Sequence, residues 1–529
     1  MDSPATKRKV KNRFTLSKSI EKFLIILKQK CSADPTESIE PLPSTSVSMP
    51  SKTNGRSDAK PIDIFALNGD CLRNVCDYCS FADLYNMCIA SDKLEIQIVQ
   101  NAVRGRTVKF SELADSCNIL DVFRIFGSTM TKLDIAEKDI QYKERKFSKF
   151  DEILRLISTY CSMDTIKHLT LQYCSGTTIK KRFLYASLPF FRGIDSLKIA
   201  ETDQHSYDDC INYFESNCEY NPDVNYFVER IVSHAVNISS LHLHNLKLSG
   251  RLFYLQHMGN LKTLSLDGCN IRVPDAFLAF LRGKPNLQSL TWSNSSLRGM
   301  DTIRSHSSNF VYELVADSMT DLTAFHYYPN EGFINDNDKY DSEFLFRMPD
   351  YNHLAKFNNL KELSIPGVTI ACLNVLAQKN TVEKLLTCFS QAPSNRNDSA
   401  YDFKFMQSFS SLKCIQLFTS FDDRAQKFNK KLMANAQHLT ECYLDFFQID
   451  EELIKIALES ARNLSVLHIS LRRGKFSTAL YAKLRAIRSK HGSARSPLVI
   501  CMEQKLAKQL LSRLKTNYRP DVIAVHESV

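Results

Sequence analysis

Glycine, proline and long apolar runs are scarce in this sequence. Only 15 of its 529 residues are Gly and 16 are Pro, which excludes a collagen-like chain and any low-complexity bulk. The longest purely apolar run near the start, Phe23 to Leu27, falls far short of the roughly 20 residues of a bilayer-spanning helix. The basic N-terminus also lacks the apolar core and small-residue cleavage site of a signal peptide. We therefore expect an intracellular protein, nuclear and/or cytoplasmic, with no membrane span.

The sequence also lacks the motifs of common catalytic and cofactor sites. It has no GxxxxGK(S/T), GxGxxG, HExxH or GxSxG pattern, which mark phosphate-binding loops, dinucleotide sites, zinc proteases and serine hydrolases. Cys76 and Cys79 form a C-x-x-C, but no second Cys pair or His pair follows at zinc spacing. The 16 Cys are expected to stay reduced and to pack as small apolar side chains. These absences predict a non-enzymatic protein without a metal or a cofactor.

Positive charge is concentrated at the N-terminus. The net charge is +10, and residues 1–30 hold nine Lys and Arg against two acidic residues. The rest is close to neutral for its size, so we expect no nucleic acid on the folded body. Residues 1–60 are predicted to be a disordered basic tail and linker, with an amphipathic stretch from Leu16 to Lys30. Lys7 to Lys11 resembles a short nuclear-localisation patch, and a solvated tail explains it equally well.

Residues 61–110 have the apolar spacing of short amphipathic helices. Apolar residues recur mostly at intervals of three and four, at Leu67, Cys71, Leu72, Val75, Tyr78, Cys79, Phe81, Leu84, Met87 and Cys88. Ser80 followed by Asp83 is a pattern that starts a helix, because the hydroxyl caps the first turn and the carboxylate favours the helix N-terminus. The segment therefore predicts a small all-α module of two or three helices.

Within this module, the run Leu67-Asn68-Gly69-Asp70-Cys71-Leu72 resembles the start of an F-box. Val75, Tyr78, Cys79 and Asp83-Leu84 continue the resemblance. The chain departs from the usual pattern where Asn68 replaces Pro and Cys76 replaces Phe. F-boxes dock on the Skp adaptor of SCF-type cullin ubiquitin ligases. The resemblance implies Skp and cullin as partners, with Leu67, Leu72, Val75 and Leu84 as the Skp-binding residues. The alternative is a helical cap for the segment that follows.

The stretch from Leu261 to Asn270 reads LKTLSLDGCN, which is the strand half of a leucine-rich repeat. Leu264 and Leu266 lie two apart and share one face of a strand. Cys269 and Asn270 are predicted to turn the corner, with the Asn side chain bonding backbone groups left unpaired by the bend. One such unit cannot bury its own apolar face, so the pattern predicts stacked neighbours.

Eleven full copies and one partial copy of the apolar triplet, at positions one, four and six, run along the chain. They are Met130/Leu133/Ile135, Ile166/Leu169/Leu171, Ile194/Leu197/Ile199, Ile238/Leu241/Leu243, Leu261/Leu264/Leu266, Leu287/Leu290/Trp292, Leu322/Phe325/Tyr327, Leu360/Leu363/Ile365, the partial Val382/Leu385, Leu412/Ile415/Leu417, Leu439/Cys442/Leu444 and Leu464/Leu467/Ile469. Amphipathic helices and polar loops are predicted between them. The pattern predicts an α/β leucine-rich-repeat solenoid over residues 111–500, with parallel strands on the concave face. Residues 501–529 are predicted to be a capping helix and tail.

Positions three, five and seven of each triplet are predicted to point to the concave face. From Ser240 onward the full triplets place hydroxyl, His, acidic and aromatic side chains there, and neither Lys nor Arg. A nucleic-acid groove needs cations, whereas this set suits a protein or peptide. The predicted substrate-binding residues are His242, His244, His326, Tyr328, Phe418 and Tyr443. The alternative is that loops or the C-terminal segment bind the partner.

A helical module of this kind ahead of leucine-rich repeats is the layout of the F-box/LRR family, which the chain resembles. The resemblance implies a substrate-recognition adaptor of an SCF ubiquitin ligase, whose F-box docks on Skp and whose repeats bind the substrate. Such an adaptor needs no chemistry of its own, because it acts by raising the effective concentration of the substrate. The alternative is a nuclear leucine-rich-repeat scaffold, or a nucleic-acid-associated protein, with no link to a ligase.

Overall fold

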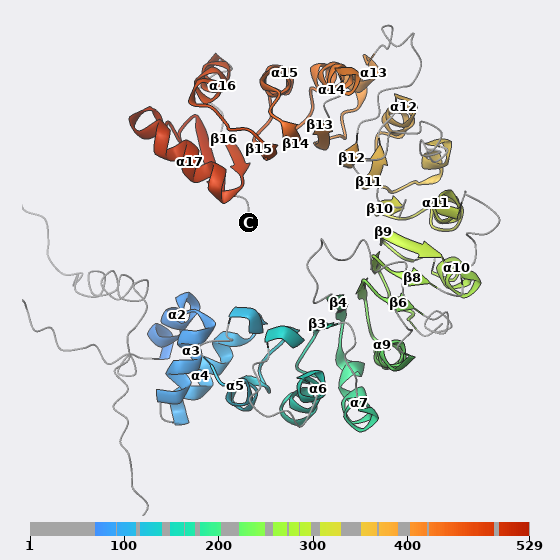
Figure 1. Ribbon diagram of the computed structural model, residues 1–529, viewed down its shortest axis with the longest axis vertical. Coiled ribbons are helices and arrows are strands. Elements are labelled where there is room, and N and C mark those ends of the chain that lie inside the picture. The colour runs from blue at the N-terminus through green and yellow to red at the C-terminus, as the bar shows by residue number, and fades with distance from the viewer. Residues whose placement is uncertain are drawn as a thin grey trace, which may run out of the picture. The chain divides into compact units, whose positions relative to one another are not determined.

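Figure 1 shows the computed structural model of the chain. The structure describes residues 69–90, 93–112, 117–139, 149–162, 164–174, 180–202, 222–248, 258–271, 274–284, 286–297, 307–329, 351–367, 370–389, 403–419, 423–490 and 497–527. The predicted tail, with Lys7 to Lys11, and Leu67 lie outside these residues. Within them, no helix is both long and apolar enough to cross a bilayer. The described chain divides into two compact units, the first running to Tyr173 and including 180–194, the second holding Cys174 and continuing from Asp195.

The first unit begins with three short helices and continues into three parallel strands. In chain order it contains α2 (Gly69–Tyr78), α3 (Phe81–Ala90), α4 (Lys93–Val103), β1 (Thr107–Lys109), η2 (Phe110–Glu112), α5 (Ile119–Phe126), β2 (Lys132–Ala136), η3 (Glu137–Asp139), α6 (Lys149–Tyr160), β3 (His168–Cys174), α7 (Lys181–Ser187) and η4 (Leu188–Gly193). Strand β2 pairs with both β1 and β3. Helix α3 begins as predicted: Asp83 N–H donates to Ser80 Oγ at 3.2 Å, and Ser80 N–H donates to Asp83 Oδ2 at 3.1 Å.

The helices and the first strands of this unit share one core. Phe81 of α3 packs against Phe126 of α5 with 5.0 Å between ring centroids, and Phe110 stacks on Phe123 at 5.4 Å. One core therefore spans the boundary predicted at residue 110, because aromatic side chains from both sides of it pack together.

The second unit is a ladder of parallel strands with connecting helices. It contains β4 (Ser196–Thr202), α9 (Pro222–His234), β5 (Ser240–His244), β6 (Lys247–Leu248), β7 (Thr263–Asp267), β8 (Asn270–Ile271), α10 (Pro274–Arg282), β9 (Ser289–Leu297), α11 (Ser307–Ser318), β10 (Ala324–Pro329), η7 (Tyr351–Lys356), β11 (Glu362–Gly367), α12 (Ile370–Lys379), β12 (Lys384–Phe389), α13 (Phe405–Ser408), β13 (Cys414–Thr419), α14 (Asp423–Asn435), β14 (Glu441–Gln448), α15 (Glu451–Ser460), β15 (Val466–Arg473), α16 (Thr478–Lys490), β16 (Leu498–Met502), α17 (Gln504–Leu514), η9 (Lys515–Asn517) and β17 (Ile523–Glu527).

Each main strand of the second unit pairs in parallel with the next in chain order, while β6 and β8 continue a small side sheet with the end of β9. The helices lie on the outer side of the ladder, and the strands line its inner side (Figure 1). This arrangement confirms the predicted α/β leucine-rich-repeat solenoid.

The register of the ladder stacks the apolar triplets on one another. Leu264 of β7 lies between Leu241 of β5 and Leu290 of β9, and Leu290 lies opposite Phe325 of β10. Every residue of the twelve triplets is at most 3% exposed. Burial of a large apolar side chain contributes roughly 1.5–3 kcal/mol, so these columns are the main stabilising feature of the ladder.

At the corners of several repeats, one residue adopts the left-handed backbone conformation. Asn245, Gly268 and Asn294 follow β5, β7 and the Trp292 segment of β9 with φ of 56°, 63° and 47°. Gly is needed at 268, because a Cβ there would lie 2.1 Å from Asn245 Oδ1. The prediction that Asn270 makes this corner is wrong. Asn270 lies in β8, and its buried Oδ1 has no hydrogen-bond partner among the described residues.

The ladder continues past the predicted end at residue 500. After α17 the chain forms β17, which pairs in parallel with β16. Two tyrosines hold this last strand: Tyr481 Oη donates to the Ile523 carbonyl at 3.2 Å, and Val525 N–H donates to Tyr518 Oη at 3.0 Å. The C-terminal segment therefore adds a strand as well as the expected helix.

Candidate functional site

The F-box-like residues that the structure describes belong to the core of the first unit. Leu72 and Val75 are each 1% exposed, and Leu84 is 0% exposed. These side chains face the interior, so they support the helices rather than present themselves to a partner. Other side chains of the same helices are exposed at the surface. Tyr78 of α2 and Ile89 of α3 are 68% and 57% exposed, unusual values for large apolar residues.

The C-x-x-C of the module is a packing and capping feature. Burial raises the pKa of the Cys76 thiol to about 11 and that of Cys79 to about 12, so both stay protonated. Their carbonyl oxygens accept hydrogen bonds from Arg106 Nη2 and Nη1 at 2.7 and 2.8 Å. Across the described part of the chain, no group of three or more His, Cys, Asp and Glu side chains is arranged to hold a metal ion.

The inner side of the second unit carries the predicted substrate-binding residues, and we call it the strand face. It consists of positions three, five and seven of the triplets, which alternate with the buried positions along each strand. In β5 the buried residues Leu241 and Leu243 are flanked by half-buried Ser240, His242 and His244. Strand pairing brings the fifth positions into one row across neighbouring strands: Lys198, His242, Ser265, Thr291, His326, Ser364, Leu386, Gln416, Tyr443 and His468.

The predicted residues lie in three pairs along this face. His242 and His244 lie together on β5, and His326 and Tyr328 lie together on β10. Tyr328 hydrogen-bonds through its hydroxyl to Ser364 of β11. Phe418 and Tyr443 lie on neighbouring strands, β13 and β14. Two strands, β7 and β9, lie between the first pair and the second.

Histidines of the strand face pair with carboxylates on the adjacent strand. His244 Nδ1 lies 2.9 Å from Asp267 Oδ2, and this hydrogen bond is the main cause that lowers the pKa of Asp267. His326 Nε2 lies 3.5 Å from Glu362 Oε1. Burial outweighs the attraction of that carboxylate and lowers the pKa of His326. These cross-strand pairs fix the imidazole rings in place.

The most ordered cluster of the face lies on β14 and β15. The rings of Tyr443 and His468 stack with centroids 3.9 Å apart and an interplanar angle of 3°. Both rings bond the same atom, because Tyr443 Oη donates to Glu441 Oε1 at 2.8 Å and His468 Nε2 lies 2.9 Å from it. Burial, followed by this hydrogen bond, raises the pKa of Tyr443. The result is a rigid aromatic surface with a carboxylate at its edge, and His468 was not among the predicted site residues.

The strand face also carries a lysine on β12 that the triplet pattern did not predict. Lys384 occupies position three of β12, in register with Glu362 of β11. Its Nζ lies 3.3 Å from Glu362 Oε1, next to His326. The absence of Lys and Arg holds for the full triplets from Ser240 onward, but it does not extend to β12 or to the exposed Lys198 at position five of β4. The partial triplet of that strand has the polar Thr387 at position six. Because its apolar pattern is incomplete, the outward-facing residues of β12 were not included in the predicted strand face.

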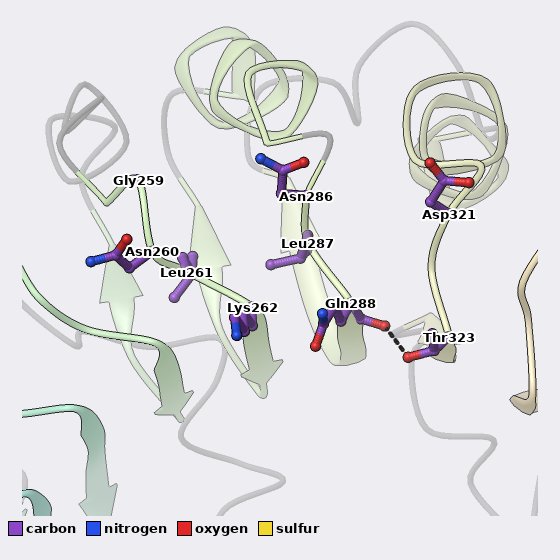
Figure 2. Close-up of a pocket in the computed structure, with 9 residues that line it drawn as sticks. All are labelled: Gly259, Asn260, Leu261, Lys262, Asn286, Leu287, Gln288, Asp321 and Thr323. Atoms are coloured by element: carbon purple, nitrogen blue, oxygen red, sulfur yellow. Dashed lines mark hydrogen bonds between the residues drawn. The ribbon is translucent and has the colours of Figure 1, made fainter.

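A shallow polar cavity of about 470 Å³ lies at the N-terminal ends of β7, β9 and β10 (Figure 2). The repeated Asn-Leu dipeptides at Asn260 and Asn286 line it, together with Asp321, Lys262 and Gln288. Thr323 Oγ1 donates to the Gln288 carbonyl at 2.9 Å. The cavity lies beside the strand face, and none of the predicted site residues lines it.

Comparisons with known proteins give similarity in fold only. No protein-family model matches the chain, and no curated protein matches it. Among solved structures, an internalin from Listeria monocytogenes is 14% identical with a TM-score of 0.32, and the match covers 63% of this chain and 92% of that one. The mouse RP105/MD-1 complex is 11% identical with a TM-score of 0.30, and the match covers 71% of this chain and 60% of that one. The assignment of the fold therefore depends on the chain's own strand pairing and triplet spacing.

Proposed function

We propose that the chain is a non-catalytic adaptor that binds a protein substrate on its strand face and docks on Skp through its N-terminal helices, as part of an SCF ubiquitin ligase. The observation that carries the substrate half is the Tyr443–His468 stack on Glu441. Flat, fixed aromatic side chains with polar tips are the anchors that protein interfaces favour, because little conformational entropy is lost when a partner covers them.

The charge of the strand face also supports a protein partner. Asp267, Glu362 and Glu441 pair across strands with His244, His326, Lys384 and His468. A groove for nucleic acid would instead present a run of unpaired cations. Mixed charges interleaved with hydroxyls and aromatic rings suit a folded protein or a peptide.

The Skp half of the proposal rests on the resemblance of residues 67–84 to an F-box and on the exposed apolar residues of α2 and α3. Tyr78 and Ile89 are the exposed large apolar side chains of these helices. Leu72, Val75 and Leu84 shape the module from within. For these three residues the prediction of a role in Skp binding thus becomes a prediction about the fold of the docking module. The prediction that Leu67 contributes to Skp binding is unchanged.

The test is quantitative affinity capture of the tagged full chain from cells. Ile89→Glu places a charge on the exposed face of α3, and Leu120→Glu is the matched control, because Leu120 is exposed on α5 of the same unit. We expect Ile89→Glu to lose Skp and cullin and to keep the partners of the strand face, while Leu120→Glu keeps both. If the unaltered chain captures neither Skp nor cullin, the ligase role is rejected and the alternative of a scaffold without a ligase is favoured.

A further inference from the structure

Charge at the C-terminal end of the second unit is strongly one-sided. Residues 472–527 hold thirteen Lys and Arg against three Asp and Glu, a net formal charge of +10. Residues 1–30 hold +7, which leaves −7 for residues 31–471. The near-neutral body expected from the sequence is therefore an acidic middle combined with a basic end.

Several cations of this end have no counter-ion in the part of the chain that the structure describes. We define the basic end as Lys475, Lys490, Lys505, Arg513 and Lys515, which are all exposed and make no side-chain hydrogen bond or ion pair with another described residue. Lys490 and Arg513 lie in the last turns of α16 and α17. The helix dipole favours cations at that position, but it does not neutralise their charge.

Three residues of the basic end, Lys490, Lys505 and Arg513, lie on the two terminal helices. Helix α17 buries Ala507, Leu510 and Leu514, so its 3.6-residue period places Lys505 on the opposite side. Helix α16 buries Leu480 and Leu484 in the same way. The helices pack against each other at the outer side of the last strands (Figure 1). Cations of consecutive helices therefore lie on one outer surface, apart from the strand face.

The surroundings of the basic end decide which anionic partner fits it. Membrane-bound helices insert an apolar face, but the apolar faces of α16 and α17 are already buried in the unit. Protein partners need apolar anchors, and the exposed large apolar residues of the described chain lie elsewhere, at Tyr78, Ile89, Leu120, Tyr185 and Val236. What is left is a set of separate, solvated point charges. Such a set suits a partner with regularly repeated anionic groups and no apolar contact.

We propose that the basic end binds the phosphate backbone of nucleic acid without reading its sequence. Lys and Arg contacts to phosphates release condensed counter-ions, so the affinity falls steeply with salt, and the logarithmic slope changes by about 0.9 for each contact. Phosphate contacts of this kind position a protein on nucleic acid but carry no sequence information. This role is independent of Skp docking and of the strand face.

The test measures binding of a fluorescein-labelled DNA duplex of mixed sequence to the full chain by fluorescence anisotropy, across a salt series. The patch variant carries Lys490→Gln, Lys505→Gln and Arg513→Gln. The control variant carries Lys262→Gln, Lys379→Gln and Lys427→Gln, which removes three exposed cations from other parts of the second unit. Both sets are made in a chain with Lys7→Gln, Arg8→Gln and Lys9→Gln, so that the tail contributes equally. Circular dichroism checks that all variants are folded.

We expect the patch variant to lose at least about tenfold in affinity and to lower the salt slope by up to about 3, because three phosphate contacts are removed. The control variant should keep both values. Equal losses in the two variants, or no loss in either, would overturn the proposal. Binding of polyglutamate or of phosphatidylserine vesicles as tight as that of the duplex, and equally sensitive to the patch variant, would also overturn it in favour of an acidic protein or a membrane.

Discussion

The guanidinium of Arg106 donates a hydrogen bond of 2.7 Å to the carbonyl oxygen of Cys76. Arg106 directly precedes β1, and Cys76 lies in the last turn of α2. A second bond from Arg106 to the Cys79 carbonyl, at 2.8 Å, completes the contact. One cation thus satisfies carbonyl groups at the C-terminal end of α2, where the helix dipole also favours positive charge. The same side chain joins the helical module to the first strand.

This contact predicts that Arg106→Ala destabilises the first unit. Hydrogen bonds to charged groups contribute about 1.5–3 kcal/mol each, so we expect the unit to unfold at a clearly lower urea concentration. Arg104→Ala is the control, because Arg104 is exposed two residues earlier. Unfolding followed by circular dichroism measures both. Equal midpoints for the two variants would show that Arg106 does not join the module to the strands.

The apolar columns of the ladder predict a second outcome. Leu264→Ala removes a side chain that is 0% exposed between Leu241 and Leu290. Core Leu→Ala changes cost about 2–5 kcal/mol. Ser265→Ala, at the next position on the strand face, should cost less than about 1 kcal/mol. Urea unfolding of the two variants tests the alternation directly, and a larger loss for Ser265→Ala would contradict the register.

Two half-buried histidines of the strand face predict how stability depends on pH. Burial lowers the pKa of His242 and of His326 below the ordinary value of 6.5. The unfolded chain therefore binds protons first as the pH falls below 6.5, and folding stability decreases from there down to the folded pKa values. At higher pH this contribution is fully present.

We expect the His242→Gln/His326→Gln variant to lose less stability than the unaltered chain between neutral and mildly acidic pH. Unfolding midpoints measured along a pH series compare the two chains. A variant that loses as much stability as the unaltered chain would show that other groups cause the acid dependence.

The basic tail predicts a change in localisation. If residues 7–13 act as a nuclear signal, Lys7→Ala, Arg8→Ala and Lys9→Ala together should move a fluorescently tagged chain out of the nucleus. Quantitative imaging of the nuclear fraction measures this. An unchanged nuclear fraction, or an unaltered chain that never enters the nucleus, would reduce the stretch to a solvated tail.

The strands could be predicted because their signal is periodic. Each apolar triplet marks a buried column: positions four and six lie on a strand, and position one lies two residues before that strand. Strand β17 was missed because only Ile523 and Val525 carry the pattern there, with Pro520 near the first position. The corner was misread because an Asn at the end of the motif is expected to turn the chain, whereas Gly268 supplies the positive φ.

The site was only partly predictable, because periodicity shows which residues share a face but not what covers that face. Leu72 and Leu84 have the spacing of a docking surface, but both side chains are buried within the unit, where α4 packs against α2 and α3. The Tyr443–His468 stack depends on two strands being in register. Neither segment alone carries a signal for it.

The central claim is that the strand face binds a protein partner through its aromatic residues. The most direct measurement is quantitative affinity capture with a Tyr328→Ala/Phe418→Ala/Tyr443→Ala variant. The matched control is Leu120→Ala/Tyr185→Ala/Val236→Ala, which removes three exposed apolar residues away from the strand face. We predict that the strand-face variant stays folded, keeps Skp and loses its substrate partners at least about tenfold, as expected for interface anchors, while the control keeps all of them. Retention of every partner by the folded strand-face variant would contradict the claim.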